Sequence, residues 1–202
     1  MDSEDDGAKE MKDLYLKELL EKLNNVEVWE KAEKKYGDYS DGVQALVALF
    51  TKHKRNDSRV FFIGNGGSAA IASHMTADFM KNGGMNTYSL YDSAVTTCMG
   101  NDYGYENVFS KPMQFLVKDN DLLVAISSSG NSQNIINAIE AVRKKGGTVV
   151  TFTGFEENNK VKSMGDINVY VPCNKYGMVE SIHNLILQQI VDLIMERDGV
   201  SL

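Results

Sequence analysis

Cysteine, proline and long apolar runs are all scarce in this 202-residue chain. No apolar run approaches the roughly 20 residues that a membrane-spanning helix needs, which argues against a membrane protein. The two cysteines, Cys98 and Cys173, could form one disulfide, but a chain of this length buries a sufficient core without it, so we expect reduced thiols in a cytoplasmic protein. Residues 1–8 are acidic and unlike a targeting signal, and we expect a disordered tail there, followed by a single domain over residues 9–202.

Positive charge is scarce as well. The chain has 28 Asp and Glu residues against 21 Lys and Arg, which gives a formal net charge of −7 at pH 7. A negative chain has no general attraction for nucleic acid or for an anionic membrane surface, so we expect a small molecule as its partner and neither of these. If that small molecule is an anion, backbone amides and hydroxyl groups must hold it, because bulk positive charge is not available.

Short apolar runs alternate with helical patterns over most of the chain. The runs predict five strands, at residues 59–63, 86–90, 121–126, 148–153 and 167–171. Helical spacing predicts helices at 69–81, 92–99, 106–117, 131–145 and 178–197. Ahead of the first strand, the same spacing predicts three helices, at 9–23, 26–35 and 39–53. This alternation predicts an α/β protein: a three-layer αβα sandwich with a parallel five-stranded sheet, preceded by N-terminal helices.

Two loops of unusual composition follow strands of this predicted sheet. Residues 64–68 read Gly-Asn-Gly-Gly-Ser and residues 127–132 read Ser-Ser-Ser-Gly-Asn-Ser; we call them the glycine loop and the serine loop. Ligands of parallel sheets bind beyond the carboxyl ends of the strands, where both loops lie. Glycines allow close approach of the backbone, amides at a helix N-terminus point at an anion, and serine hydroxyls add donors. The two loops therefore predict a phosphate site.

Two alternatives to a phosphate site are open. Each loop alone could be a turn followed by a helix N-cap, since Ser and Asn favour both, but this accounts less well for a pair of such loops in one sheet. Gly64, Gly66 and Ala69 also fit the Gly-x-Gly-x-x-Ala pattern of dinucleotide-binding folds, with Asp92 placed to contact a ribose. The serine loop has no role in a dinucleotide fold, and the chain has no separate substrate domain, which weighs against this alternative.

These loops, together with Gly-Asn-Asp-Tyr-Gly at residues 100–104 and the segment from Glu180 to Gln188, resemble the sugar isomerase (SIS) family of phosphosugar-binding domains, and within it the heptose phosphate isomerases. The resemblance covers about residues 10–197. It implies a flavodoxin-like sandwich, a homotetramer with active sites at subunit interfaces, and aldose–ketose isomerisation of sedoheptulose 7-phosphate to a heptose 7-phosphate. The alternative is a non-catalytic phosphosugar-binding or regulatory protein with a protein partner, because some members of this family bind or regulate instead.

The resemblance also implies which residues bind the sugar phosphate. Sugar hydroxyls are expected near Asn101 and Asp102, and Ser128 is expected to contribute its backbone amide rather than its hydroxyl. The phosphate is expected on the two loops, at Gly66, Gly67, Ser68, Ser127, Ser128, Ser129 and Ser132.

The acid–base or metal site implied by the resemblance departs from the family pattern. The heptose isomerases carry His-x-x-x-Glu on the helix after the glycine loop, and a Gln and a His eight residues apart on the last helix; these four hold Zn²⁺ or act as base and acid. Here the corresponding residues are His74 and Asp78, then Glu180 and Gln188. Asp78 or Glu180 can serve as base in an enediol mechanism, whereas Gln188 does not titrate and is a weak ligand. We therefore expect these four residues to cluster, with Zn²⁺ as a candidate cofactor, and a structural role for His183.

Overall fold

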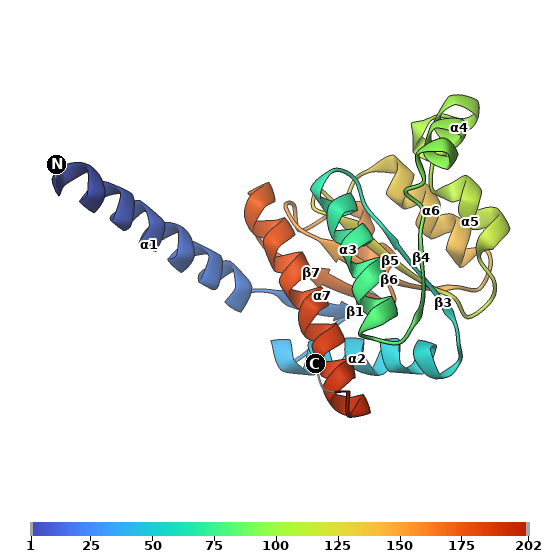
Figure 1. The fold of residues 1–202 in the computed structure, drawn as a ribbon, viewed down its shortest axis with the longest axis horizontal. Coiled ribbons are helices and arrows are strands. Elements are labelled where there is room, and N and C mark those ends of the chain that lie inside the picture. The colour runs from blue at the N-terminus through green and yellow to red at the C-terminus, as the bar shows by residue number, and fades with distance from the viewer. Residues whose placement is uncertain (1, 201–202) are drawn as a thin grey trace.

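A seven-stranded sheet forms the centre of the molecule, with helices on both of its faces (Figure 1). The computed structural model describes residues 2–200, with side chains described from residue 13 onward. The strands are β1 (Glu27–Glu30), β2 (Lys34–Lys35), β3 (Arg59–Ile63), β4 (Asn86–Ser89), β5 (Leu122–Ser127), β6 (Thr148–Thr153) and β7 (Ile167–Tyr170). The helices are α1 (Asp2–Asn24), α2 (Tyr39–Arg55), α3 (Gly67–Lys81), α4 (Ser93–Tyr103), α5 (Ser110–Leu116), α6 (Gln133–Arg143) and α7 (Tyr176–Asp198), with short 3₁₀ helices η1 (Tyr105–Asn107) and η2 (Lys160–Met164).

The strand order across the sheet is β2-β1-β7-β6-β5-β3-β4. The strands from β7 to β4 in this order are parallel to one another, which confirms the five parallel strands predicted from the sequence. From β3, the chain moves first to β4 on one side and then to β5 on the other, so its direction across the sheet reverses between β3 and β5. Such a reversal opens a crevice at the carboxyl ends of the two strands, where ligands of open parallel sheets bind.

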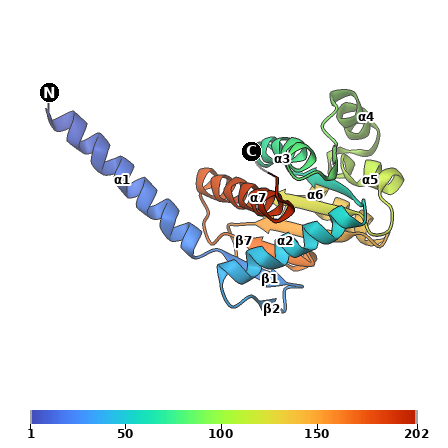
Figure 2. The ribbon, with the colours of Figure 1, turned by 60° about the horizontal axis from the view of Figure 1, so that its bottom comes forward.

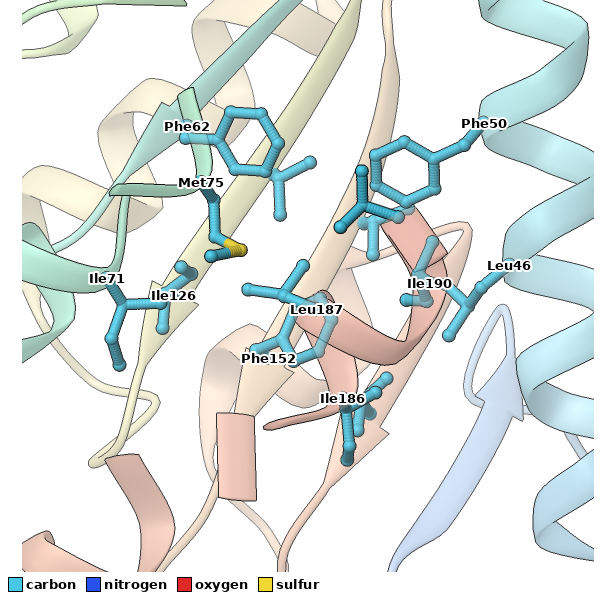
Figure 3. Packing of buried hydrophobic residues seen from close by; sticks show 14 of the residues in the cluster. Leu46, Phe50, Phe62, Ile71, Met75, Ile126, Phe152, Ile186, Leu187 and Ile190 are labelled. Carbon is cyan, nitrogen blue, oxygen red and sulfur yellow. The ribbon is translucent and has the colours of Figure 1, made fainter. Parts of the chain in front are cut away.

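Two apolar clusters, one on each face, hold the helices to the sheet. Alternate side chains of β3 point to opposite faces, so that Val60 and Phe62 belong to one cluster and Phe61 and Ile63 to the other. The second cluster lies against α5 and α6. The first lies against α2, α3 and α7, and Figure 3 shows its helix and strand side chains meeting at Leu46, Phe50, Phe62, Ile71, Met75, Ile126, Phe152, Ile186, Leu187 and Ile190. The result is the predicted three-layer αβα sandwich.

Residues 26–35, which the sequence predicted as a helix, form the hairpin of β1 and β2 instead. β1 pairs antiparallel with both β7 and β2, which adds two strands to the edge of the parallel sheet. Glu, Lys and Ala in this segment favour a helix, but Val26 and Val28 are buried and Glu27 between them is less so. Val28 packs closely against Gly42 of α2. This burial at every second residue outweighs the local helix propensity.

The helix α1 extends away from the rest of the molecule (Figures 1 and 2). It includes the helix predicted at residues 9–23 and begins at Asp2. Residues 2–8, for which we expected a disordered tail, are therefore helical in the structure, while residue 1 of that tail lies outside the described residues. None of the described helices is long and apolar enough to cross a membrane.

His183 is a fully buried titratable side chain of α7. Its Nε2–H donates to the carbonyl oxygen of Thr153 at the end of β6, at 3.1 Å, and its Nδ1 has no partner among the described residues. Burial lowers the pKa of His183 to about 4, because the charged imidazole would lose its hydration. The neutral side chain links α7 to β6, in keeping with the structural role expected from the sequence.

The free energy of unfolding is expected to fall as the pH is lowered from 6.5 towards 4. In this range His183 of the unfolded chain, with a pKa near 6.5, takes up a proton that the folded chain does not. This one group then lowers stability by up to about 1.4 kcal/mol per pH unit. Urea denaturation at a series of pH values measures the effect. His183→Gln keeps a donor but does not titrate, so its pH dependence should be shallower, and an unchanged slope would contradict the assignment.

Candidate active site

The glycine loop and the serine loop meet at the carboxyl edge of the sheet. β3 and β5 are hydrogen-bonded neighbours, and the glycine loop follows β3 while the serine loop begins at the last residue of β5. α3 begins at Gly67, within the glycine loop, and α6 begins at Gln133, directly after the serine loop. The N-termini of both helices therefore lie at the crevice where the chain reverses across the sheet, and their first amides point outward from the helices.

A cavity of about 350 Å³ lies between the two loops and the start of α7. Tyr176 lines it, although no sequence signal pointed to this residue, and so do Asn65, Ile126 and Glu180. The rest of the lining consists of residues expected to bind phosphate: Gly66, Gly67, Ser68, Ser127, Ser128, Ser129 and Ser132. The structure thus brings both loops to a single cavity.

Several polar groups at this cavity are available to a ligand. The amides of Gly67 and Ser68 open α3 and precede its first intrahelical hydrogen bonds. Ser132 is the N-cap of α6, yet its side chain makes no capping hydrogen bond. The hydroxyl of Ser128 is buried and has no partner within the part of the chain that the structure describes. An unpaired buried hydroxyl such as that of Ser128 is costly, and an anion with several acceptor oxygens, such as a phosphate, would accept from it and from the neighbouring donors together.

Glu180 brings a carboxylate into the same cavity. A Cβ atom at position 67 would lie 2.2 Å from Glu180 Oε2, so only glycine allows this approach of α7 to the start of α3. Among the described residues that line the cavity, Glu180 is the one charged side chain. The cavity therefore combines neutral anion-binding donors with a group that can accept a proton.

Residues 154–161 pack against the turn of the serine loop and hydrogen-bond to its backbone. Gly130 has a φ of 62°, and a Cβ atom there would lie 1.8 Å from Asn159 Oδ1, so both the backbone and the space require glycine. The amide of Gly154 donates to the carbonyl of Ser128 at 3.0 Å, and the amide of Val161 donates to the carbonyl of Gly130 at 2.9 Å. A loop that is ordered before its ligand arrives loses less entropy on binding.

Tyr91 holds the glycine loop in a similar way. The amide of Gly64 donates to Tyr91 Oη at 2.6 Å, and the Tyr91 hydroxyl donates to the Gly64 carbonyl at 2.9 Å. Burial raises the pKa of Tyr91 well above its usual range, so the hydroxyl keeps its proton. The amides of Asn65 and Asn134 donate to each other's side-chain oxygens at 3.0 and 2.8 Å, which links the glycine loop to α6 beyond the serine loop.

His74, Asp78 and Gln188 form a second polar cluster, between α3 and α7. Gln188 Nε2 donates to Asp78 Oδ2 at 2.6 Å and to His74 Nε2 at 3.0 Å, and His74 Nε2 lies 3.3 Å from Asp78 Oδ2. To accept this hydrogen bond, His74 Nε2 must be unprotonated. Glu180 lies eight residues before Gln188, or about 12 Å along α7, with its carboxylate at Gly67.

The structure does not bring the four predicted metal ligands together. The Gln188 amide lies between the His74 imidazole and the Asp78 carboxylate and presents N–H donors to both. Within residues 13–200, no group of three or more His, Cys, Asp and Glu side chains is arranged to hold a metal ion. A Zn²⁺ site needs at least three protein ligands with free lone pairs, so the residues as placed do not fit Zn²⁺.

Asn101 and Asp102 lie away from the cavity. Both are exposed on α4, which has no buried residue, and Asn101 Nδ2 donates to Asp102 Oδ1 at 2.9 Å. Neither lines the cavity, so the structure does not bring them to the two loops. Asp92, considered above as a ribose contact, is the N-cap of α4 and accepts a hydrogen bond from the Val95 amide at 2.9 Å. Its position is explained by helix capping.

A parallel sheet with donor-rich loops at its reversal point defines a class of domains that bind phosphorylated ligands. Residues 25–154 match the SIS domain family, and the chain belongs to this family. This confirms the family indicated by the two loops.

Within that family, the chain is similar to phosphoheptose isomerases. It is 34% identical to the phosphoheptose isomerase of Sulfurimonas denitrificans over 198 residues, which cover 93% of this chain and 98% of the relative. It is 33% identical to the phosphoheptose isomerase structure from Neisseria gonorrhoeae, with a TM-score of 0.71, covering 78% of this chain and 85% of that one. A phosphoheptose isomerase structure from Francisella tularensis is 24% identical, with a TM-score of 0.79 over 97% of this chain and all of that one, and supports the fold.

Ser128→Ala is expected to weaken phosphate binding without destabilising the fold. In the ligand-free protein it removes a buried hydroxyl that has no partner in the described part of the chain, so the free energy of unfolding should not fall. A bound phosphate would lose one hydrogen bond to a charged group, which should weaken its affinity by about 1.5–3 kcal/mol. Calorimetry with inorganic phosphate and urea denaturation measure the two effects.

Ser110→Ala is the matched control for this experiment. Ser110 is also buried, but its hydroxyl donates to Asn107 Oδ1 at 3.0 Å, away from the cavity. This control should lose stability and keep its phosphate affinity. If Ser128→Ala behaves like Ser110→Ala, the Ser128 hydroxyl is not part of a phosphate site, and the expectation that only its amide contributes would stand.

Proposed function

We propose that this chain catalyses the aldose–ketose isomerisation of sedoheptulose 7-phosphate to an aldose heptose 7-phosphate. The observation that carries the proposal is the cavity in which two loops offer unpaired donors beside a carboxylate. The similar phosphoheptose isomerases, one of which matches 93% of this chain, support the same reaction. The two loops would hold the phosphate, and the carbon chain would extend towards α3 and α7.

The reaction requires one base and one carrier for hydroxyl protons. The base removes a proton from C1 of the ketose while the C2 carbonyl oxygen takes up a proton, which gives an enediol. The proton held by the base then returns to C2, and O1 releases its proton as C1 becomes the aldehyde carbonyl. Atoms and charge balance without any further reactant.

We assign the base to Asp78 and the carrier of the hydroxyl protons to His74. C1 and C2 lie at the end of the sugar opposite the phosphate, whereas Glu180 touches Gly67 within the phosphate-binding part of the cavity. His74 follows Gly67 by seven residues, or about 10 Å along α3. Glu180, nearer the phosphate, would orient the sugar hydroxyls there. No step of this proposal passes through a metal ion.

Asp78→Asn is expected to lower kcat by about 100-fold or more, because the amide cannot take the proton from C1. The inhibition constant of inorganic phosphate should stay unchanged, since Asp78 lies outside the phosphate-binding cavity. Steady-state kinetics with sedoheptulose 7-phosphate measure both quantities. Glu180→Gln is the matched comparison, with the larger change expected in KM. If instead Glu180→Gln loses turnover and Asp78→Asn keeps it, Glu180 is the base.

One observation favours a second function, a non-catalytic phosphosugar-binding or regulatory protein with a protein partner. Gln188, which cannot titrate, occupies the position at which the family pattern has a histidine. Its side-chain amide donates hydrogen bonds to both His74 and Asp78. Incubation of the wild-type protein with sedoheptulose 7-phosphate, followed by detection of the aldose product, separates the two functions. Product formation supports the isomerase. Saturable binding without turnover would overturn it in favour of the binding protein.

We further propose a homotetramer in which α1 packs on neighbouring subunits. Leu14, Leu16 and Leu20 of α1 are each about half exposed or more. A groove of about 620 Å³ between the end of α1, the start of α2 and α7 is lined in part by Leu185 and Gln188. Apolar surface of this kind is typical of subunit contacts. Because Gln188 belongs to both the groove and the polar cluster with Asp78, assembly would place a subunit interface beside the proposed base.

Light scattering at micromolar concentration is expected to give the mass of four chains. The double variant Leu16→Glu with Leu20→Glu should dissociate, because it places charge on the apolar side of α1, and turnover should fall together with assembly. Lys17→Glu, on the same helix, is the charge-matched control and should remain assembled. A single-chain mass for the wild-type protein would contradict the proposal.

A cytoplasmic location is also part of the proposal. Cys98 is exposed and Cys173 is buried, and both are free thiols in the structure. Free thiols are typical of proteins kept in a reducing compartment.

A further inference from the structure

Tyr176, on α7, lines the proposed active-site cavity together with the first residues of α3. It is the first residue of α7, four residues before Glu180, and its side chain is 61% exposed. The phosphate-binding loops and Tyr176 border the same space. An exposed aromatic ring beside the hydroxyls and amides of this cavity offers a surface for the carbon–hydrogen side of a ligand.

Phe155 holds the ring of Tyr176 in place. The two ring centroids are 4.7 Å apart and the planes meet at 74°, an edge-to-face contact. Phe155 follows β6 by two residues, so its position is set by the sheet rather than by α7. The contact therefore links Tyr176 to the residues that follow β6. The same residues support the serine loop, because the Gly154 amide donates to the Ser128 carbonyl.

The backbone of Phe155 is held in a conformation that a bulky side chain disfavours. Its φ of 55° lies in the left-handed region, which is sparsely populated by residues other than Gly, Asn and Asp. The Phe155 amide donates to the Cys173 carbonyl at 2.9 Å, and the Tyr170 hydroxyl donates to the Phe155 carbonyl at 2.8 Å. Strain that surrounding contacts enforce in this way is frequent at functional sites.

We propose that Tyr176 is a specificity-determining residue, against whose ring the carbon atoms nearest the phosphate of the phosphorylated sugar pack, and that Phe155 is its positioning residue. The proposal rests on the proposed function for the identity of the sugar. The amides and hydroxyls of the two loops recognise a phosphate but not what is attached to it. Tyr176 supplies the missing discrimination, because the carbon–hydrogen groups of a sugar can pack against its ring and inorganic phosphate has none.

Calorimetry of the full chain with sedoheptulose 7-phosphate and with inorganic phosphate tests the proposal. The wild-type protein should bind the sugar phosphate more tightly than inorganic phosphate. Tyr176→Ala should bind the sugar phosphate about ten-fold more weakly and inorganic phosphate unchanged, since the loss of an aromatic contact is confined to the carbon chain. Tyr176→Phe keeps the ring and should restore most of the preference for the sugar phosphate.

Phe155→Asn tests the positioning role separately. Asparagine tolerates the left-handed backbone but has no aromatic edge, so part of the preference for the sugar phosphate should be lost. The Phe155 ring also packs against the first apolar cluster, so the melting temperature should fall as well, and circular dichroism checks that the variant is folded at the temperature of the binding experiment. Phe115→Ala, which removes an exposed aromatic ring from α5 away from the cavity, is the matched control and should bind both ligands as the wild type does.

The proposal is overturned if Tyr176→Ala keeps the wild-type affinity for the sugar phosphate, or weakens both ligands equally. Equal affinities of the wild-type protein for the two ligands would also overturn it. Turnover, measured as formation of the aldose product, is a separate result from these affinities. A wild-type protein that prefers the sugar phosphate through Tyr176 but forms no aldose product would refute the isomerase and leave the role of Tyr176 standing.

Discussion

Parallel pairing of β3 with β5 is the interaction on which the proposed site depends. Val60 faces Leu122 and Ile63 faces Ala125, in a register that ends both strands at the same edge of the sheet. The pairing brings the glycine loop and the serine loop together although they are far apart in the chain. A shift by one residue would turn the side chains of a strand to the opposite face, so the apolar clusters on both faces also fix the position of the loops.

Neutral donors explain how a chain with a net charge of −7 would bind an anion at the proposed site. The cavity presents helix N-terminal amides and serine hydroxyls, and the charged side chain in its described lining is Glu180, which is negative. Donors of this kind are effective because the fold holds them in place: Tyr91 fixes Gly64, and residues 154–161 fix the turn at Gly130. A cavity lined by lysines or arginines would pair with the Glu180 carboxylate. The neutral donors leave this carboxylate free to contact the ligand.

The strands β3 and β5 and the two loops were predictable because each strand has a local signature, an apolar run that ends in glycine or serine. The hairpin at residues 26–35 was not, because its Glu, Lys and Ala favour a helix and only burial of Val26 and Val28 reveals a strand. At the site, spacing along α3 and α7 correctly joined His74 and Asp78 to Gln188, but it could not show that Glu180 turns towards Gly67 instead. Tyr176 was missed because its place at the cavity depends on a contact with Phe155, which lies far from it in the chain.

The central claim, that the two loops form a single phosphate-binding cavity, is tested most directly by following backbone amide NMR signals during a titration with sedoheptulose 7-phosphate. The account predicts saturable shifts that are largest at residues 66–68 and 127–132, the amides nearest the cavity. Shifts centred on another part of the surface, such as the groove beside Leu185 and Leu193, with both loops unchanged, would contradict it.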